Sequence, residues 1–160
     1  MDKTVIIQPE SGLQYDWKAI AADPSGKHEP QKDVIAYKAY YINKIAQVRT
    51  RGQEPVLVSL PIIDENRFFA SITRGFTMQE RANLLYWLGG KTERLRNMQD
   101  VYNIALFRLA AQQCVHIIDI TTPMLSNPHY DELLEQDGVT LSLSGEQLLS
   151  SHIRLGLLAG

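Results

Sequence analysis

The sequence has one cysteine, little net charge and no long apolar run. The single cysteine, Cys114, excludes an intramolecular disulfide, and its place just before an apolar run predicts a small buried side chain. A chain without disulfides suits a reducing compartment, so we expect a cytoplasmic protein. No basic segment precedes an apolar signal core, and no apolar stretch has the length of a bilayer span, so no membrane span is expected.

The charge is also nearly balanced, with a formal net charge of -2. Lysines and arginines do not cluster with aromatic residues, so the sequence predicts no nucleic-acid partner. Cysteines and histidines lack metal-ligand spacing, and neither a Walker loop nor a dinucleotide fingerprint is present. We therefore expect no metal and no cofactor.

Three short apolar runs predict buried strands, over residues 4–8, 55–60 and 115–120. The run at 55–60 is unbroken, which favours a parallel sheet covered on both faces. Helices are expected over residues 32–50, 77–89, 92–113, 130–136 and 144–158. This alternation is typical of an α/β layered domain, and the length of 160 residues suits a single domain spanning residues 1–160.

Two of these helices begin with capping-box spacing. Thr77 is followed three residues later by Glu80, and Ser144 is followed by Gln147. In this motif the hydroxyl and the longer side chain each satisfy a free backbone amide of the first turn. The spacing predicts helix starts at Thr77 and at Ser144.

A ligand site is expected beyond the carboxyl ends of the strands, where parallel α/β sheets bind ligands. The loops that meet there supply Glu10, Ser11, Asp16, Asp64, Arg67, Asp137 and Thr140. Each also has an ordinary structural interpretation: Asp137 before Gly138 is a common turn, and Ser11 can satisfy local backbone groups. Asp64 and Arg67 can form a surface ion pair of little energetic value.

The four histidines supply few general bases for this site. His116 lies inside an apolar run, where a packed imidazole is expected, while His28 and His152 lie outside the predicted site loops. His129 is the one histidine close in sequence to the last site loop. It is the sole substitute base that the sequence offers there.

Several segments resemble the SGNH, or GDSL-type, hydrolases, a family largely of esterases and lipases. The likeness rests on PVLVSLPIIDENRFFASITRGF, on MQDVYNIALFRLAAQQCVHIIDIT and on DGVTLSLSGEQLL. It implies a flavodoxin-like three-layer α/β fold with a parallel sheet, and an acyl-ester or sugar-like ligand. It also implies a serine nucleophile, oxyanion donors from a glycine and an asparagine, and an Asp-x-x-His pair near the end.

Carried onto this chain, the family pattern is incomplete. Asp137 matches the catalytic aspartate, but Thr140 stands at the histidine position, and a hydroxyl cannot serve as a general base near neutral pH. The oxyanion block falls on residues 9–12, which include Ser11 and Gly12 but lack the family's glycine and asparagine in their places. The segment that brings the nucleophile and the first two strands is not found, so the sheet is expected to contain the later strands alone.

Two functions follow from this pattern. The first is an SGNH hydrolase-like domain related to acyl-ester hydrolases but catalytically incomplete, with Asp64, Arg67, Ser11 and Gly12 as binding residues. The alternative is a non-catalytic binding or assembly module that forms a homo-oligomer. In the second case the strand at 4–8 lies at a sheet edge, which needs a cover from a second copy, from an N-terminal segment or from residues 13–20.

Overall fold

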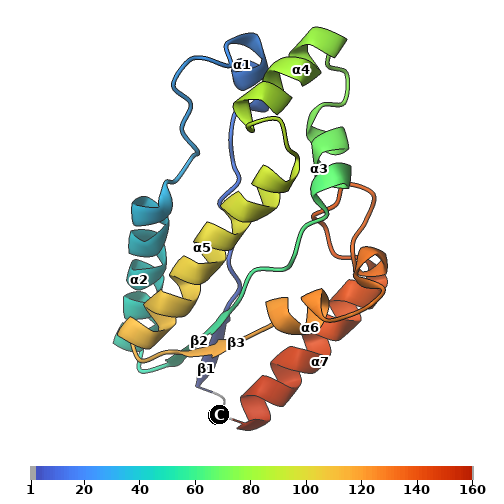
Figure 1. Cartoon of the computed structure of the whole chain (residues 1–160). Coiled ribbons are helices and arrows are strands. Elements are labelled where there is room, and N and C mark those ends of the chain that lie inside the picture. Colours follow the sequence, from blue (N-terminus) through green and yellow to red (C-terminus); the bar gives the residue numbers. More distant parts are fainter. Residues whose placement is uncertain (1–2, 160) are drawn as a thin grey trace.

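A parallel three-stranded sheet forms the centre of the computed structural model, which describes residues 3–159 (Figure 1). Its strands are β1 (Thr4–Ile7), β2 (Glu54–Val58) and β3 (His116–Ile118), in the order β1-β2-β3. Thr4 pairs with Glu54, and Val56 pairs with His116. The predicted parallel sheet is confirmed, with β1 at one edge.

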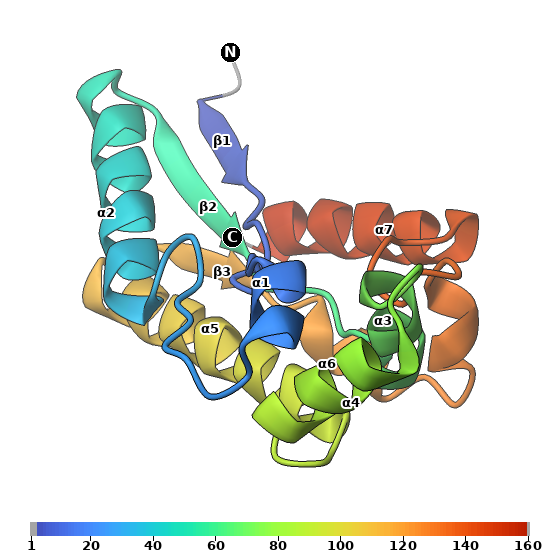
Figure 2. The same ribbon diagram turned by 90° about the horizontal axis from the view of Figure 1, so that it is seen from above.

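Helices cover both faces of this sheet, as Figure 2 shows. Because strand side chains alternate between faces, Val5, Ile7 and Leu57 pack against α2 (Val34–Thr50) and α5 (Glu93–Gln112). Ile6, Val56, Val58 and Ile118 face the opposite layer. That layer contains α6 (Thr121–Leu125), the 3-10 helix η1 (Tyr130–Leu133) and α7 (Leu143–Ala159). The predicted three-layer α/β fold is therefore confirmed.

Three further helices gather beyond the carboxyl ends of the strands (Figure 1). They are α1 (Trp17–Ala22), α3 (Glu65–Ile72) and α4 (Met78–Trp87). A separate apolar cluster holds them together, and its buried members are Leu13, Ile20, Ile63, Leu84, Leu88 and Leu95. Residues 13–20, one of the expected covers for the edge of β1, belong to this cluster instead.

The helix starts agree with the sequence in part. Thr77 and Glu80 form both hydrogen bonds of the capping box at the start of α4, as predicted. The predicted start of the last helix at Ser144 is wrong, because α7 begins at Leu143 and the hydroxyl of Ser142 accepts a hydrogen bond from the Gly145 amide. The helix expected over residues 130–136 is the shorter η1.

Two predictions of burial are wrong. Cys114 is exposed, because it lies in the turn between α5 and β3 with a positive φ of 52° that directs the chain into the strand. His116 is also exposed, since β3 is only three residues long and His116 is its first residue. Within residues 3–159, no helix combines the length and apolar character needed to span a bilayer.

Candidate functional site

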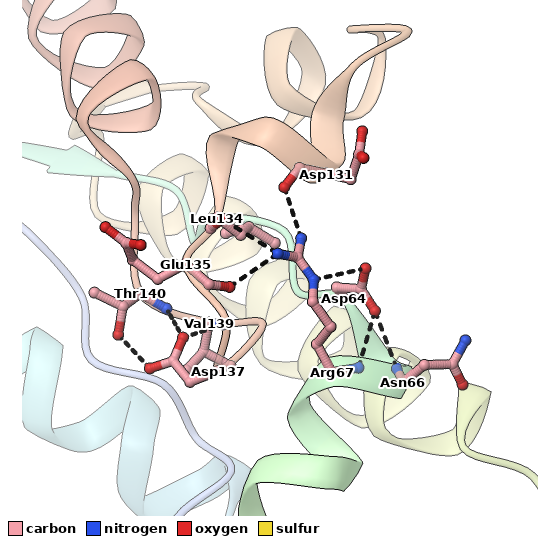
Figure 3. Close-up of polar contacts among 9 residues, drawn as sticks. All are labelled: Asp64, Asn66, Arg67, Asp131, Leu134, Glu135, Asp137, Val139 and Thr140. Carbon is pink, nitrogen blue, oxygen red and sulfur yellow. Dashed lines mark hydrogen bonds and ion pairs between the residues drawn. The ribbon is translucent and has the colours of Figure 1, made fainter.

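Arg67 is the central residue of a polar cluster between α3 and the loop before α7 (Figure 3). Its Nε donates to Asp64 Oδ2 over 3.2 Å, and its Nη2 donates to the Asp131 carbonyl over 2.7 Å. Its Nη1 donates to the carbonyls of Leu134 and Glu135 at 3.3 and 3.0 Å. The ion pair that the sequence suggested is present, and the Arg67 side chain, which is only 27% exposed, satisfies three carbonyls besides it.

Asp64 joins the same loop to the start of α3. Its Oδ1 accepts hydrogen bonds from the amides of Asn66 and Arg67, which makes it the N-cap of α3. Its own amide donates to the Gly138 carbonyl over 2.8 Å. Gly138 has a φ of 75°, and a Cβ there would lie 2.6 Å from the Asp64 carbonyl oxygen. The loop therefore packs against α3 at a distance that only glycine permits.

Asp137 and Thr140 meet within this loop, as their spacing predicted (Figure 3). Asp137 Oδ1 accepts from the amides of Val139 and Thr140, and Asp137 Oδ2 accepts from the Thr140 hydroxyl over 2.5 Å. Partial burial would raise the pKa of Asp137, but these hydrogen bonds and the charge of Arg67 together lower it. The carboxylate is thus held in its ionised form as part of a closed turn.

Ser11 and Gly12 lie on a different loop, directly after β1. The Ser11 hydroxyl donates to Gln99 Oε1 over 3.0 Å and accepts from the Leu13 amide over 3.1 Å. A Cβ on Gly12 would lie 2.3 Å from the ring of Tyr102, so this glycine allows α5 to approach the loop. The expected local backbone role of Ser11 is confirmed.

Two buried amides on α5 were not predicted, and they connect the loops at the carboxyl ends of all three strands. Gln99 accepts from Ser11 after β1 and donates to the Pro61 carbonyl after β2 over 3.4 Å. Asn103, one helical turn later, accepts from the Leu60 amide over 2.8 Å and donates to Thr121 Oγ1 over 2.9 Å. Amides four residues apart on the inner stripe of a helix are the signal that could have revealed them.

Ser59 completes this arrangement between β2 and β3. Its hydroxyl is fully buried and accepts hydrogen bonds from the amides of Ile120 and Thr121, at 2.8 and 3.1 Å. It also accepts from the Thr121 hydroxyl over 2.9 Å. Asp119, which ends the apolar run, accepts from the Thr122 amide and hydroxyl, as a loop-capping carboxylate would. The ends of β2 and β3 are therefore fixed to each other by short polar contacts.

A cavity of about 240 Å³ opens beside these groups, between α5, α6 and the loop after β2. Its polar lining residues are Arg96, Gln99, Asp100, Asn103 and Thr121. Burial raises the pKa of Asp100, and the charge of Arg96 opposes that rise. This is the hollow at the carboxyl end of the sheet that has room for part of a small ligand.

The histidines do not join the polar groups of these loops. His129 is exposed between α6 and η1, and its amide donates to Asn127 Oδ1 over 2.9 Å. The rings of His28 and His152 bond to the backbone carbonyls of Asp23 and Leu148. Across residues 3–159, no histidine ring hydrogen-bonds to a serine hydroxyl or to Asp137. The described chain also contains no group of three His, Cys, Asp or Glu residues arranged to hold a metal ion.

The structure therefore brings together Asp64, Arg67, Asp137 and Thr140. Ser11 and Gly12 belong to a second cluster with Gln99, and His129 stands apart from both. In the part of the chain that the structure describes, no hydrogen bond or ion pair connects these three groups.

Comparison with known proteins found a similar fold but no related sequence. No protein-family model matches the sequence, and no curated protein matches it. The structure is similar to the crystal structure of the lipase/acylhydrolase from Enterococcus faecalis, with a TM-score of 0.52 and 19% sequence identity. The match covers 94% of this chain and 58% of that chain, so this chain spans little more than half the length of that protein. This likeness concerns the α/β fold that the two proteins share.

Proposed function

We propose that this chain is an SGNH-type, hydrolase-like domain whose own residues do not complete the catalytic apparatus. The family motifs in the sequence and the likeness to the lipase/acylhydrolase support the assignment. The observation that carries the proposal is the hydrogen bond from the Thr140 hydroxyl to Asp137, at the position where the family pattern has a histidine.

The chemistry of that pair explains why ester cleavage is not expected. A serine becomes nucleophilic when a neighbouring base accepts its proton, and the base is usually an imidazole oriented by a carboxylate. Here the Asp137 carboxylate accepts hydrogen bonds from the Thr140 hydroxyl and from two backbone amides of its own turn. It therefore orients no imidazole. Ser11 donates to an amide oxygen of Gln99, which is not basic.

The test is hydrolysis of an aryl acetate together with labelling by a serine-directed fluorophosphonate. We expect a hydrolysis rate equal to that of buffer and no covalent label at any serine. The variants His129→Ala and Ser11→Ala should give the same background rate. Asp137→Ala should lower the melting temperature while hydrolysis stays at background. Labelled serine, or turnover that His129→Ala abolishes, would show that the chain is an active esterase.

On this proposal the 240 Å³ cavity is the place for an acyl-ester or sugar-like ligand. Its amide and hydroxyl groups offer donors and acceptors of the kind that bind sugar hydroxyls, and Ile62 and Leu125 provide apolar surface. The polar cluster of Arg67 then has a structural role outside the cavity, because it fixes the loop that packs against α3.

A second function, assembly through β1, is favoured by the open edge of the sheet. β1 pairs with β2 alone among the described strands, and a groove of about 240 Å³ runs along it. Lys44 of α2 and Arg51, the C-cap of that helix, border the groove. The exposed Leu155 and Leu158 lie near the end of α7, which packs on the face of the sheet that presents Ile6 of β1 and Ile118 of β3. An edge with apolar neighbours of this kind is suited to pairing with another chain.

Light scattering across micromolar concentrations tests the assembly function. We expect an oligomer that the double variant Leu155→Lys, Leu158→Lys converts to monomer, because two charges per chain would have to be desolvated in the contact. Met78→Lys is the matched control. Met78 is 88% exposed and lies on α4, which is beyond the carboxyl ends of the strands and away from the edge of β1. A wild-type monomer whose β1 amides are protected in hydrogen exchange would exclude this function.

A further inference from the structure

A second and larger cavity lies on the opposite side of α5 from the polar network of Asn103. Its volume is about 490 Å³, within the range of small-molecule sites. Four segments surround it: the loop before α1, the loop before α2, the end of α4 and the first half of α5. Its lining residues are Tyr15, Pro30, Asp33, Val34, Trp87, Arg94, Met98, Val101 and Tyr102.

The aromatic side of this cavity is rigid. The rings of Tyr15 and Trp87 meet edge to face with centroids 5.3 Å apart, and Trp17 packs against both. The Tyr102 hydroxyl donates to the Lys32 carbonyl over 2.8 Å, which fixes the loop before α2 against α5. A site built from such side chains is largely preformed, so binding a ligand loses little conformational entropy in the side chains.

Three hydrogen-bond donors of this cavity have no partner in residues 3–159. They are the hydroxyl of Tyr15, the indole N–H of Trp87 and the guanidinium of Arg94, none of which forms a side-chain hydrogen bond or ion pair there. Arg94 and Tyr15 line the same cavity, and burial raises the pKa of Tyr15 while the charge of Arg94 opposes that rise. The phenol remains protonated at neutral pH and is available as a donor.

The same cavity also carries a negative charge, that of Asp33. Asp33 Oδ1 accepts from the Ala36 amide as the N-cap of α2. Burial raises the pKa of Tyr102 to about 12, with smaller contributions from Tyr15 and from the charge of Asp33. Asp33 Oδ1 is therefore occupied by the start of α2, whereas the exposed Arg94 guanidinium has no protein partner among residues 3–159. The apolar side chains of Val34, Met98 and Val101 complete the lining.

We infer that this cavity binds a small carboxylate with a compact apolar body. Arg94 and the Tyr15 hydroxyl hold the carboxylate, the Trp87 N–H donates to it, and the apolar body lies against Met98 and Val101. Donors without protein partners that line one cavity favour an anionic acceptor, since charge-assisted hydrogen bonds are the strong ones. The apolar walls exclude inorganic anions as the best ligands. This inference does not depend on the proposed function, because it uses none of the residues of the candidate hydrolytic site.

Three matched probes test it: 3-phenylpropanoate, 3-phenylpropanamide and 3-phenylpropylamine, which share one body and differ in the charge of the head. Binding is followed by calorimetry and by the NMR signals of the two indole N–H groups. We expect 3-phenylpropanoate to bind with a Kd of about 0.1–1 mM, as its size allows, and to shift the Trp87 signal. The amide and the amine should bind at least about tenfold more weakly.

Variants test whether binding depends on the specific side chains of the cavity. Arg94→Gln should weaken 3-phenylpropanoate at least about tenfold, and Tyr15→Phe about three- to tenfold, while each leaves the melting temperature nearly unchanged. Arg108→Gln and Tyr86→Phe are the controls, since both residues are exposed, on α5 and α4 respectively, and should leave binding intact. Tighter binding of the amine, no saturable shift up to about 10 mM, or full binding by Arg94→Gln would overturn the inference.

Discussion

Gly138→Ala is expected to destabilise the fold by about 3 kcal/mol or more, through overpacking added to backbone strain. The residue has a φ of 75°, which L side chains rarely adopt. Its Cβ would lie 2.6 Å from the Asp64 carbonyl oxygen and 2.7 Å from the Phe68 amide nitrogen. Both neighbours are backbone atoms of α3 or its cap, so neither can rotate away.

Urea denaturation measures this loss, and Gly89→Ala is its matched control. Gly89 has a φ of 77° but nothing within 4 Å of the added Cβ, so its variant isolates the conformational cost of about 1 kcal/mol. The difference between the two variants gives the cost of close packing. Equal losses would mean that the loop moves freely off α3, and that the contacts of Arg67 do not hold it there.

Asn103→Ala should also cost about 3 kcal/mol, by a different mechanism. The side chain is 8% exposed, and its truncation leaves the Leu60 amide without an acceptor. It also removes the amide that donates to Thr121 and opens a space beside the existing cavity. The loss therefore combines an unsatisfied buried donor with lost packing.

Chemical denaturation with Asn97→Ala as the control checks this prediction. Asn97 lies on the exposed side of the same helix, so its replacement should change stability by less than about 0.5 kcal/mol. Hydrogen exchange should show faster opening of the Leu60 and Ile120 amides in Asn103→Ala. A loss equal to that of the control would show that the ends of β2 and β3 are fixed by Ser59 alone.

The central elements could be predicted because their signals are local. The strands at β1 and β2 are uninterrupted apolar runs, and the long helices α2 and α5 have regular apolar spacing. The short helices α1, α3 and α6 could not be predicted, because five to eight residues carry too little periodicity. Packing in the cluster that contains Ile20, Phe69 and Leu84 stabilises α1 and α3 instead.

The candidate site was predictable only where its partners are close in sequence. Asp137 and Thr140 are three residues apart, so their contact follows from turn geometry. The carbonyl partners of Arg67 lie 64 to 68 residues further along the chain. Every residue has a backbone carbonyl, so the sequence does not indicate which ones bind Arg67. His129 and Ser11 remain predictions as site residues, and Ser11 is placed by Gln99, a residue 88 positions away.

The exposed thiol of Cys114 affects how the protein must be handled in solution. Because it is the single cysteine and lies outside the core, air oxidation can join two chains by one covalent bridge. Such cross-linked pairs would have the mass of a dimer without any contact at β1. Samples for light scattering should therefore contain a reductant, and Cys114→Ser provides a form in which every association is noncovalent.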